Sequence, residues 1–375
     1  MSPQIEVQLV AVVTAMACAL PGAFLVLRRM AMMSDAISHA ILPGIVIGFF
    51  ITESLGSPLL LIGAALTGLI TVALVELIER TGLVREDAAI GIVFPVLFSI
   101  GVILIARFAG DVHLDTDAVL LGELAFTPFN RIEIAGMDMG PRALWIMGIV
   151  LIANALFLGL FYKELKLATF DAALAATLGF MPGVLHYALM GMVSITAVSA
   201  FDAVGSILVV ALMVGPPATA YLLTDRLDVM IGLSAALGIA NALLGYALAA
   251  WLDASIAGSM AAMAGMLFGL ALLGAPHRGL FAQMHRHHRQ KRTFAVQMVA
   301  AYLTETAPTL SADQAPAALH HHFGWSPAKS QRVLRQASDA NVIKTTGNTV
   351  TLTKKGRSIA RDIPQDERNA TAHTS

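Results

Sequence analysis

Long apolar stretches, each about the length of a membrane-spanning helix, dominate the first three quarters of the chain. A bilayer core about 30 Å thick needs roughly 20 apolar residues in a helix. Such stretches cover residues 5–27, 34–52, 58–78, 88–108, 143–162, 184–200, 205–224, 229–251 and 256–274. The sixth and seventh abut at Phe201–Gly205 and form either two helices or one broken element. The pattern therefore predicts eight or nine membrane-spanning helices.

Composition excludes an ordinary soluble enzyme and divides the chain in two. The 375 residues are 57% hydrophobic and 13% charged, whereas soluble domains carry about 25% charged residues. A single cysteine, Cys18, excludes a disulfide framework and a multi-thiolate metal cluster. Residues 1–275 hold ten Lys and Arg against nineteen Asp and Glu, and residues 276–375 hold fourteen against six. We therefore place a domain boundary near Ala275–Pro276.

Basic residues gather in alternate loops, and this asymmetry predicts the orientation. The loops after spans one, three, five and seven carry Arg28, Arg29, Arg80, Arg85, Lys163, Lys166 and Arg226. The opposite loops carry more acidic residues, among them Asp115 and Asp117 close to His113. Because cytoplasmic loops carry the excess of Lys and Arg, we expect a multi-pass protein of the cytoplasmic (inner) membrane with its C-terminal part in the cytoplasm. The N-terminus lies outside for nine spans and inside for eight.

Asp35 and His39 are ionisable residues in the second apolar stretch. A charged side chain at the bilayer centre costs on the order of 3 kcal/mol, so its presence needs a reason. On a helix, a spacing of four places both side chains on one face, with Ser38 alongside. A carboxylate with an imidazole suits Mn²⁺, Fe²⁺ or Zn²⁺, and Pro43 would bend the helix beside them. The alternative is a pair that caps the helix near the cytoplasmic surface.

Asp202 stands at the junction of the sixth and seventh stretches. Broken helices mark substrate pathways in many transporters, which makes Asp202 a candidate pathway residue together with Ser38. The alternative is a plain N-cap for a helix that starts at Ala203.

The inner loop of residues 163–183 is the longest on its side before the C-terminal part. Asp171 can cap a short helix over Ala172–Leu178, and Gly179 can end it. Such a helix could bind a soluble partner or lie on the membrane surface. The chain contains no Gly-x-x-x-x-Gly-Lys-[Ser/Thr] sequence, so an ATP-driven process would need its ATPase on another polypeptide.

Several of these segments together resemble the membrane permeases of manganese, zinc and iron uptake ABC transporters. The resemblance covers most of residues 10–275. Its motifs are Arg28–Met30, Asp35–His39, Glu86–Phe94, Val112–Asp115, Leu185–Tyr187 and Phe201–Leu227. Two positions depart from the family pattern, because Ser34 stands where Gly is expected and Pro95 where a small residue is expected.

The resemblance implies a transport subunit and not an enzyme. It implies that Asp35 and His39 are intramembrane metal ligands, and that residues 170–179, including Phe170, Asp171, Leu178 and Gly179, form the helix that couples to the ATPase. The implied partners are cytoplasmic ATP-binding subunits, an extracytoplasmic metal-binding protein and a second permease subunit, identical or not. No cofactor is permanently bound, and Mn²⁺, Zn²⁺ or Fe²⁺ is the cargo. Two ligands do not rank these ions.

The C-terminal part is predicted as a small α+β domain. We expect a basic juxtamembrane linker over 276–293 that contacts membrane lipid, a domain over 294–363 and a disordered tail over 364–375. Helices at 294–305, 315–322, 326–340 and 355–362, with a hairpin of 342–345 and 349–353, follow the order of a winged helix. This domain resembles the DNA-binding domain of iron- and manganese-dependent repressors. The expected fold is thus an all-α polytopic membrane bundle (1–275) followed by a winged-helix cytoplasmic domain.

Three basic residues on the third of these helices, Lys329, Arg332 and Arg335, could contact phosphates. We favour a docking or regulatory module over nucleic acid binding, because the domain is tethered to a membrane. His320–His322 are adjacent and point in different directions on a helix, which favours a solvated stretch over a metal site.

Three interpretations of the whole chain compete. A metal-uptake permease with a regulatory tail is favoured. A membrane-tethered metal-responsive transcriptional regulator would need only one or two spans. A permease for an organic chelate or vitamin does not explain Asp35 and His39, which suit a bare ion.

Overall fold

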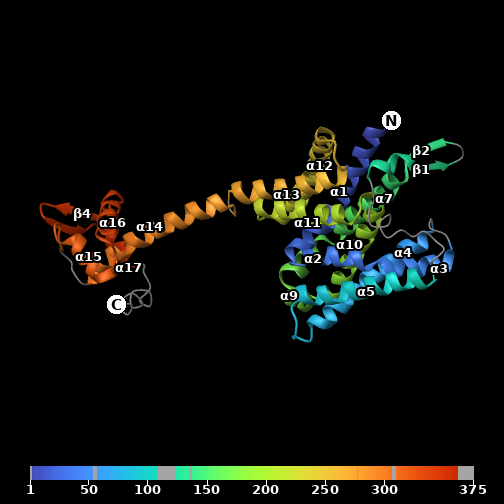
Figure 1. The fold of residues 1–375 in the computed structure, drawn as a ribbon. Coiled ribbons are helices and arrows are strands. Elements are labelled where there is room, and N and C mark those ends of the chain that lie inside the picture. The colour runs from blue at the N-terminus through green and yellow to red at the C-terminus, as the bar shows by residue number, and fades with distance from the viewer. Residues whose placement is uncertain are drawn as a thin grey trace. The chain divides into compact units, whose positions relative to one another are not determined.

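A computed structural model describes residues 2–53, 57–108, 124–134, 137–276, 278–305 and 310–361. The predicted acidic loop at His113, with its Val112–Asp115 motif, and the predicted tail 364–375 lie outside the described residues. The chain divides into two compact units, residues 1–279 and residues 280–375 (Figure 1).

The first unit is a helix bundle, and its described residues contain nine candidate membrane spans. The number of candidate spans among the described residues agrees with the upper of the two expected counts, eight or nine. The long helices are α1 (Pro3–Leu27), α4 (Pro58–Glu79), α5 (Glu86–Phe108), α7 (Arg142–Leu160), α10 (Pro182–Val204), α11 (Ser206–Leu223), α12 (Leu227–Leu252) and α13 (Ile256–Gly274). The remaining span, Ala31–Thr52, consists of α2 (Ala31–Ala40) and α3 (Leu42–Thr52).

Helix α1 is the central helix of the bundle. It packs against α7, α10, α11 and α12, and its residues from Val10 to Leu25 are largely buried. Between helices, the buried Asn154 side-chain nitrogen of α7 donates hydrogen bonds to the Ala17 carbonyl at 3.0 Å and to the Thr196 hydroxyl at 2.8 Å. Without bulk water at this depth, such bonds and close packing hold the helices together.

Two glycines determine local geometry in the bundle. A Cβ atom at Gly44 of α3 would lie 2.1 Å from the Gly63 carbonyl oxygen of α4, so only glycine permits this close approach. Gly205 has φ of 80° and separates α10 from α11. An L-residue with a side chain rarely adopts this conformation. The sixth and seventh stretches are therefore two distinct helices.

A short hairpin departs from the all-helical expectation. The segment η1 (Leu124–Phe129) leads into strands β1 (Arg131–Ile134) and β2 (Met137–Pro141), which pair antiparallel. This segment packs on α1. Four- and five-residue strands between apolar spans carry too little periodicity to be separated from loop by pattern alone.

The second unit contains α14 (Leu280–Glu305), β3 (Leu310–Ser311), α15 (Ala315–Phe323), α16 (Pro327–Asp339), β4 (Ile343–Thr346), β5 (Thr349–Leu352) and α17 (Lys354–Arg361). The predicted helices and hairpin are confirmed. Ser326 caps α16 by accepting from the Lys329 amide, and Gly347 turns the hairpin with φ of 61°. The strands form an antiparallel sheet in the order β3-β5-β4. The sequence pattern missed β3, which has two residues, and it missed that α14 begins at Leu280.

Candidate functional site

Asp35 and His39 face each other on one turn of α2. His39 Nε2 lies 3.5 Å from Asp35 Oδ1, and about a third of each side chain is exposed, 32% for His39 and 37% for Asp35. The His39 ring also lies 6.0 Å from the Phe94 ring of α5. The prediction that Asp35 and His39 lie on one face of a helix is confirmed. Neither side chain is completely covered by the rest of the protein.

Buried serines fix the same short helix. The Ser38 hydroxyl donates to the Ser34 carbonyl at 2.9 Å, and the Ser34 hydroxyl donates to the Ala31 carbonyl at 2.9 Å. Both serines are buried. The Ser38 proton is thus bonded within its own helix, and the role of Ser38 as a pathway residue stays a prediction.

The helix is interrupted just after His39. Helix α2 ends at Ala40, Ile41 separates the two helices, and α3 begins at Leu42. Pro43 has no N–H to donate to the His39 carbonyl, which explains the interruption. The expected interruption of the helix next to the candidate site is therefore present, although Ile41 keeps a right-handed helical conformation.

Asp202 lies away from helix starts. It is exposed and occupies the last turn of α10, and the next helix begins only at Ser206. The alternative of an N-cap for a helix starting at Ala203 is wrong. A carboxylate near a helix C-terminus is electrostatically unfavourable, so helix capping does not explain its presence.

The Asp35–His39 pair has no third potential ligand of these types beside it in the part of the chain that the structure describes. Within the described ranges, no three His, Cys, Asp or Glu side chains gather closely enough to hold a metal ion. This excludes a preformed cage of protein ligands from that part of the chain. A cation held by Asp35 and His39 would complete its coordination with water or with another subunit.

The predicted short helix in the 163–183 loop is present. Helix α8 (Tyr162–Phe170) precedes α9 (Ala172–Thr177), and the Asp171 side chain caps α9 by accepting from the Leu174 amide at 2.8 Å. Leu178 is the C-cap, and Gly179 follows with φ of 86°. The side chains of Phe170 and Leu178 are 64% and 61% exposed.

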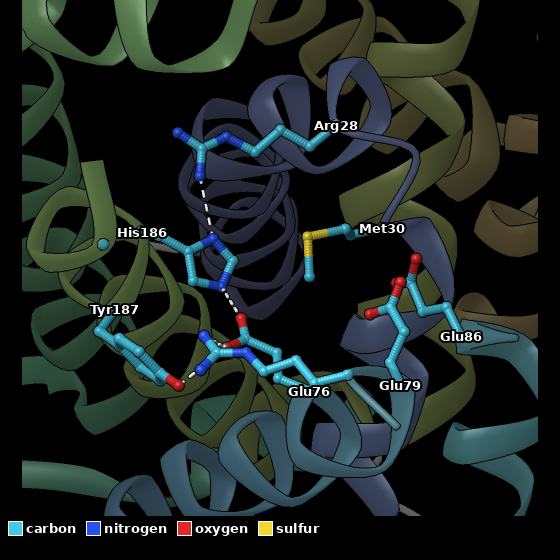
Figure 2. A pocket seen from close by; sticks show the side chains of 9 residues that line it. Arg28, Met30, Glu76, Glu79, Glu86, His186 and Tyr187 are labelled. Carbon is cyan, nitrogen blue, oxygen red and sulfur yellow. Dashed lines mark hydrogen bonds and ion pairs between the residues drawn. The ribbon is translucent and has the colours of Figure 1, made fainter. Parts of the chain in front are cut away.

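A cavity of about 510 Å³ lies among the end of α1, the end of α4 and the start of α10 (Figure 2). The sequence pattern did not predict it. Its lining combines three glutamates with two arginines, a histidine and a tyrosine: Arg28, Met30, Glu76, Glu79, Arg80, Glu86, Gly183, His186 and Tyr187. Asp35 and His39 do not line it, although α2 begins one residue after Met30. The sequence signal is His186 in the Leu185–Tyr187 motif, near the edge of a span, but its partners Arg28 and Glu76 are far away along the chain.

A polar network crosses this cavity. Arg28 Nη1 lies 3.0 Å from His186 Nδ1, and His186 Nε2 is in close contact with Glu76 Oε1. The Tyr187 hydroxyl donates to Glu76 Oε2 at 2.8 Å, and Arg80 Nη2 lies 3.5 Å from the same oxygen. A second nitrogen of the same guanidinium, Arg28 Nε, donates to the Thr169 hydroxyl at 3.1 Å. Burial lowers the pKa of the Arg28 guanidinium.

A second ionic cluster joins the β1–β2 hairpin to the first helix. Arg131 binds Glu6 and also lies 2.7 Å from Asp138. Hydrogen bonds to Asp138 and then to Glu6 raise the pKa of Arg131, and the hydrogen bond from Arg131 lowers the pKa of Asp138.

Nine candidate spans within the described ranges, with a hydrophilic pair inside one of them, are the features of a multi-pass membrane protein. The chain belongs to the ABC 3 transport family, whose model matches residues 4–275.

Curated relatives and solved structures agree with this assignment. The chain is 45% identical to the zinc transport system membrane protein TroD of Treponema pallidum, covering 95% of this chain and 97% of that protein. It is 48% identical to the manganese transport system membrane protein MntD of Bacillus subtilis, covering 73% and 93%. PsaBC from Streptococcus pneumoniae in complex with Fab is similar with a TM-score of 0.62 at 29% identity, covering 74% and 94%.

These findings decide between the competing interpretations of the chain. The family match favours transport, and the alternative of a membrane-tethered regulator receives no support. TroD is named for zinc and MntD for manganese, so iron lacks the support that these two ions have. The ligand roles of Asp35 and His39 and the coupling role of α9 stay predictions.

Proposed function

We propose that this chain is the permease subunit of an ABC importer for manganese or zinc, and that Asp35 and His39 bind the ion transiently within the membrane. The observation that carries the proposal is the His39 Nε2 to Asp35 Oδ1 distance of 3.5 Å on a helix of a candidate span. Iron is left out because TroD and MntD are named for zinc and manganese.

The chemistry of the pair suits transport better than storage. One carboxylate and one imidazole provide a mixed oxygen and nitrogen donor set for a divalent transition metal. Two protein ligands hold an ion weakly, so water can complete the shell and the ion can leave. The partial exposure of both side chains gives the ion and its water access.

Energy comes from partner subunits. Helix α9 and its flanks present Phe170, Leu174 and Leu178, each at least 45% exposed. We assign this apolar surface as the docking site of a cytoplasmic ATP-binding subunit, with Asp171 and Gly179 defining the ends of the helix. A second permease subunit and an extracytoplasmic metal-binding protein complete the importer. Alternating access around a fixed site then moves the ion.

The site is tested by metal uptake into cells that express the complete transporter with Asp35→Asn or His39→Gln. We expect uptake of Mn²⁺ or Zn²⁺ to fall at least tenfold in either variant, because each removes one of two ligands. Asp228→Asn is the matched control, since Asp228 pairs with exposed Arg226. Unchanged uptake in both site variants would contradict the assignment.

The second unit is proposed as a winged-helix module with a docking or regulatory role in the cytoplasm. Its element order and its β3-β5-β4 sheet support this. Lys329, Arg332 and Arg335 are exposed on α16, and Lys329 Nζ lies 4.8 Å from the centre of the Trp325 ring.

The full chain with these three residues replaced by Gln tests the role. We expect ion uptake to lose its response to the metal supply of the medium while the maximal rate is kept. Wild-type chain that binds a random DNA duplex in a salt-dependent manner, with uptake control unaltered by the replacements, would favour nucleic acid binding instead.

A further inference from the structure

The polar network beside the cavity joins segments that are far apart in the sequence. Thr169 lies 141 residues from Arg28, and His186 lies 158 residues from it. Arg28 follows the end of α1, Glu76 belongs to α4, and Thr169 belongs to α8. The other two side chains, His186 and Tyr187, belong to α10. Figure 2 shows the Arg28 guanidinium above the His186 ring, with Glu76 and Tyr187 below it.

The partners determine the hydrogen-bonding roles in this network. Arginine has five N–H donors and no acceptor, so His186 Nδ1 must accept from Arg28. The proton of the ring is then on the remaining nitrogen, Nε2, which lies in close contact with Glu76 Oε1. A neutral imidazole therefore connects a cationic and an anionic group, and Tyr187 and Arg80 also contact the carboxylate. This arrangement holds the Arg28 side chain in one orientation.

Arg28 is positioned between the two elements that the transport cycle must connect. The residue after it, Arg29, has φ of 63°, and this tight turn leads directly into α2, where Asp35 follows seven residues after Arg28. Thr169 is the last residue but one of α8, and Asp171, the N-cap of α9, comes two residues later. One guanidinium thus bonds the segment entering the metal-binding helix to the segment entering the docking helix.

We propose that Arg28 is a positioning residue that makes α9 and the start of α2 move together, so that motion of the ATPase is transmitted to the Asp35–His39 site. This inference rests on the proposed function. A guanidinium is planar and offers donors in a fixed fork, which lets Nε hold Thr169 while Nη1 holds His186. Lysine keeps the charge, but its three N–H donors sit on one nitrogen and lack the planar fork that reaches both partners in this geometry.

The first test measures ion uptake and ATP hydrolysis together. The permease is reconstituted in proteoliposomes with its ATPase and its binding protein, and Mn²⁺ and Zn²⁺ are supplied. For Arg28→Lys we expect about tenfold fewer ions transported per ATP hydrolysed, from the loss of one charge-assisted hydrogen bond, with ATP hydrolysis within about twofold of wild type. Thr169→Val should act in the same direction. Arg226→Lys is the matched control, because Arg226 does not line the cavity and its exposed side chain pairs with Asp228.

The double variant separates a shared contact from two independent defects. If Arg28 and Thr169 act through one bond, Arg28→Lys with Thr169→Val transports no fewer ions per ATP than Arg28→Lys alone. Multiplied losses would overturn the inference. If ion uptake and ATP hydrolysis fall in parallel, the number of ions transported per ATP is unchanged and Arg28 has a structural role only. Wild-type values for both rates would also overturn the inference.

A second measurement does not depend on the identity of the cargo. Spin labels are attached to cysteines introduced by Met32→Cys and Ala173→Cys, because both positions are exposed. The native cysteine is removed by Cys18→Ser so that only these two positions carry a label. We expect the distance between the labels to stay the same with and without ATP in wild type, and to change or broaden with ATP in Arg28→Lys. Equal changes in both proteins would overturn the inference. Failure of wild type to take up either ion would instead count against the proposed function alone.

Discussion

Arg131 Nη1 lies 2.9 Å from Glu6 Oε2, and the Glu6 side chain is only 4% exposed. The bond ties the β1–β2 hairpin to the first turn of the central helix. A buried carboxylate without its partner is strongly destabilising. Arg131→Gln should therefore lower the melting temperature of the purified protein, and Arg226→Gln, at an exposed pair, should leave it unchanged. Equal melting temperatures for both variants would contradict a role of Arg131 in holding the hairpin.

The same cluster makes stability depend on pH. Arg131 lowers the pKa of Asp138 below its ordinary value of 3.8. A lowered folded-state pKa contributes stability that is fully present above the ordinary value and is lost as the pH falls through the lowered one. Melting curves from pH 6 to pH 3 should show a smaller acid loss for Asp138→Asn than for wild type. An identical acid loss in both would show that Asp138 contributes nothing.

Gly44→Ala should prevent α3 from reaching α4, because the new methyl group would lie 2.1 Å from a backbone carbonyl of Gly63 that cannot move aside cheaply. We expect little monodisperse protein in detergent. Gly148→Ala on α7 is the matched control, because a Cβ there meets nothing within 4 Å. It should be neutral or stabilising, since alanine favours a helix by about 1 kcal/mol over glycine.

Asn154→Ala removes two hydrogen bonds between helices, to Ala17 and to Thr196. Bonds of this kind contribute about 0.6 kcal/mol each on average in a membrane protein. The expected loss is about 1 kcal/mol in the free energy of unfolding, measured by denaturation in mixed micelles. Thr196→Val should cost less, because the bond to Ala17 persists. A larger loss for Thr196→Val would contradict this ranking.

Phe170→Ala together with Leu178→Ala should weaken binding of the ATP-binding subunit without lowering the stability of the permease, since both side chains are more than 60% exposed. Co-purification with the tagged ATPase measures the effect. Leu83→Ala provides the control, because Leu83 is 87% exposed in the loop after α4. Equal recovery of the ATPase with both variants would rule out this docking surface.

Local patterns in the sequence were sufficient for much of the fold. Span-length apolar runs predicted each of the nine candidate spans in the described part of the chain, and Ser326–Pro327 with Gly347–Asn348 predicted α16 and the hairpin. The Asp35–His39 contact was equally predictable, because helix geometry alone brings residues four apart together. The break at Gly205 left two options open along the chain, and its φ of 80° decided for two helices.

What the amino-acid sequence determined by itself, then, is much of what depends on neighbours along the chain: the spans, the caps of α9 and α16, the turn at Gly347 and the polar pair on α2. Only the tertiary structure decided that Arg28 bonds to Thr169 and His186, that Arg131 reaches Glu6, and that Gly44 meets Gly63. The physical reason is distance in sequence. These partners come together only when whole helices pack, and helix packing depends on the summed fit of many side chains, which no single spacing along the chain records.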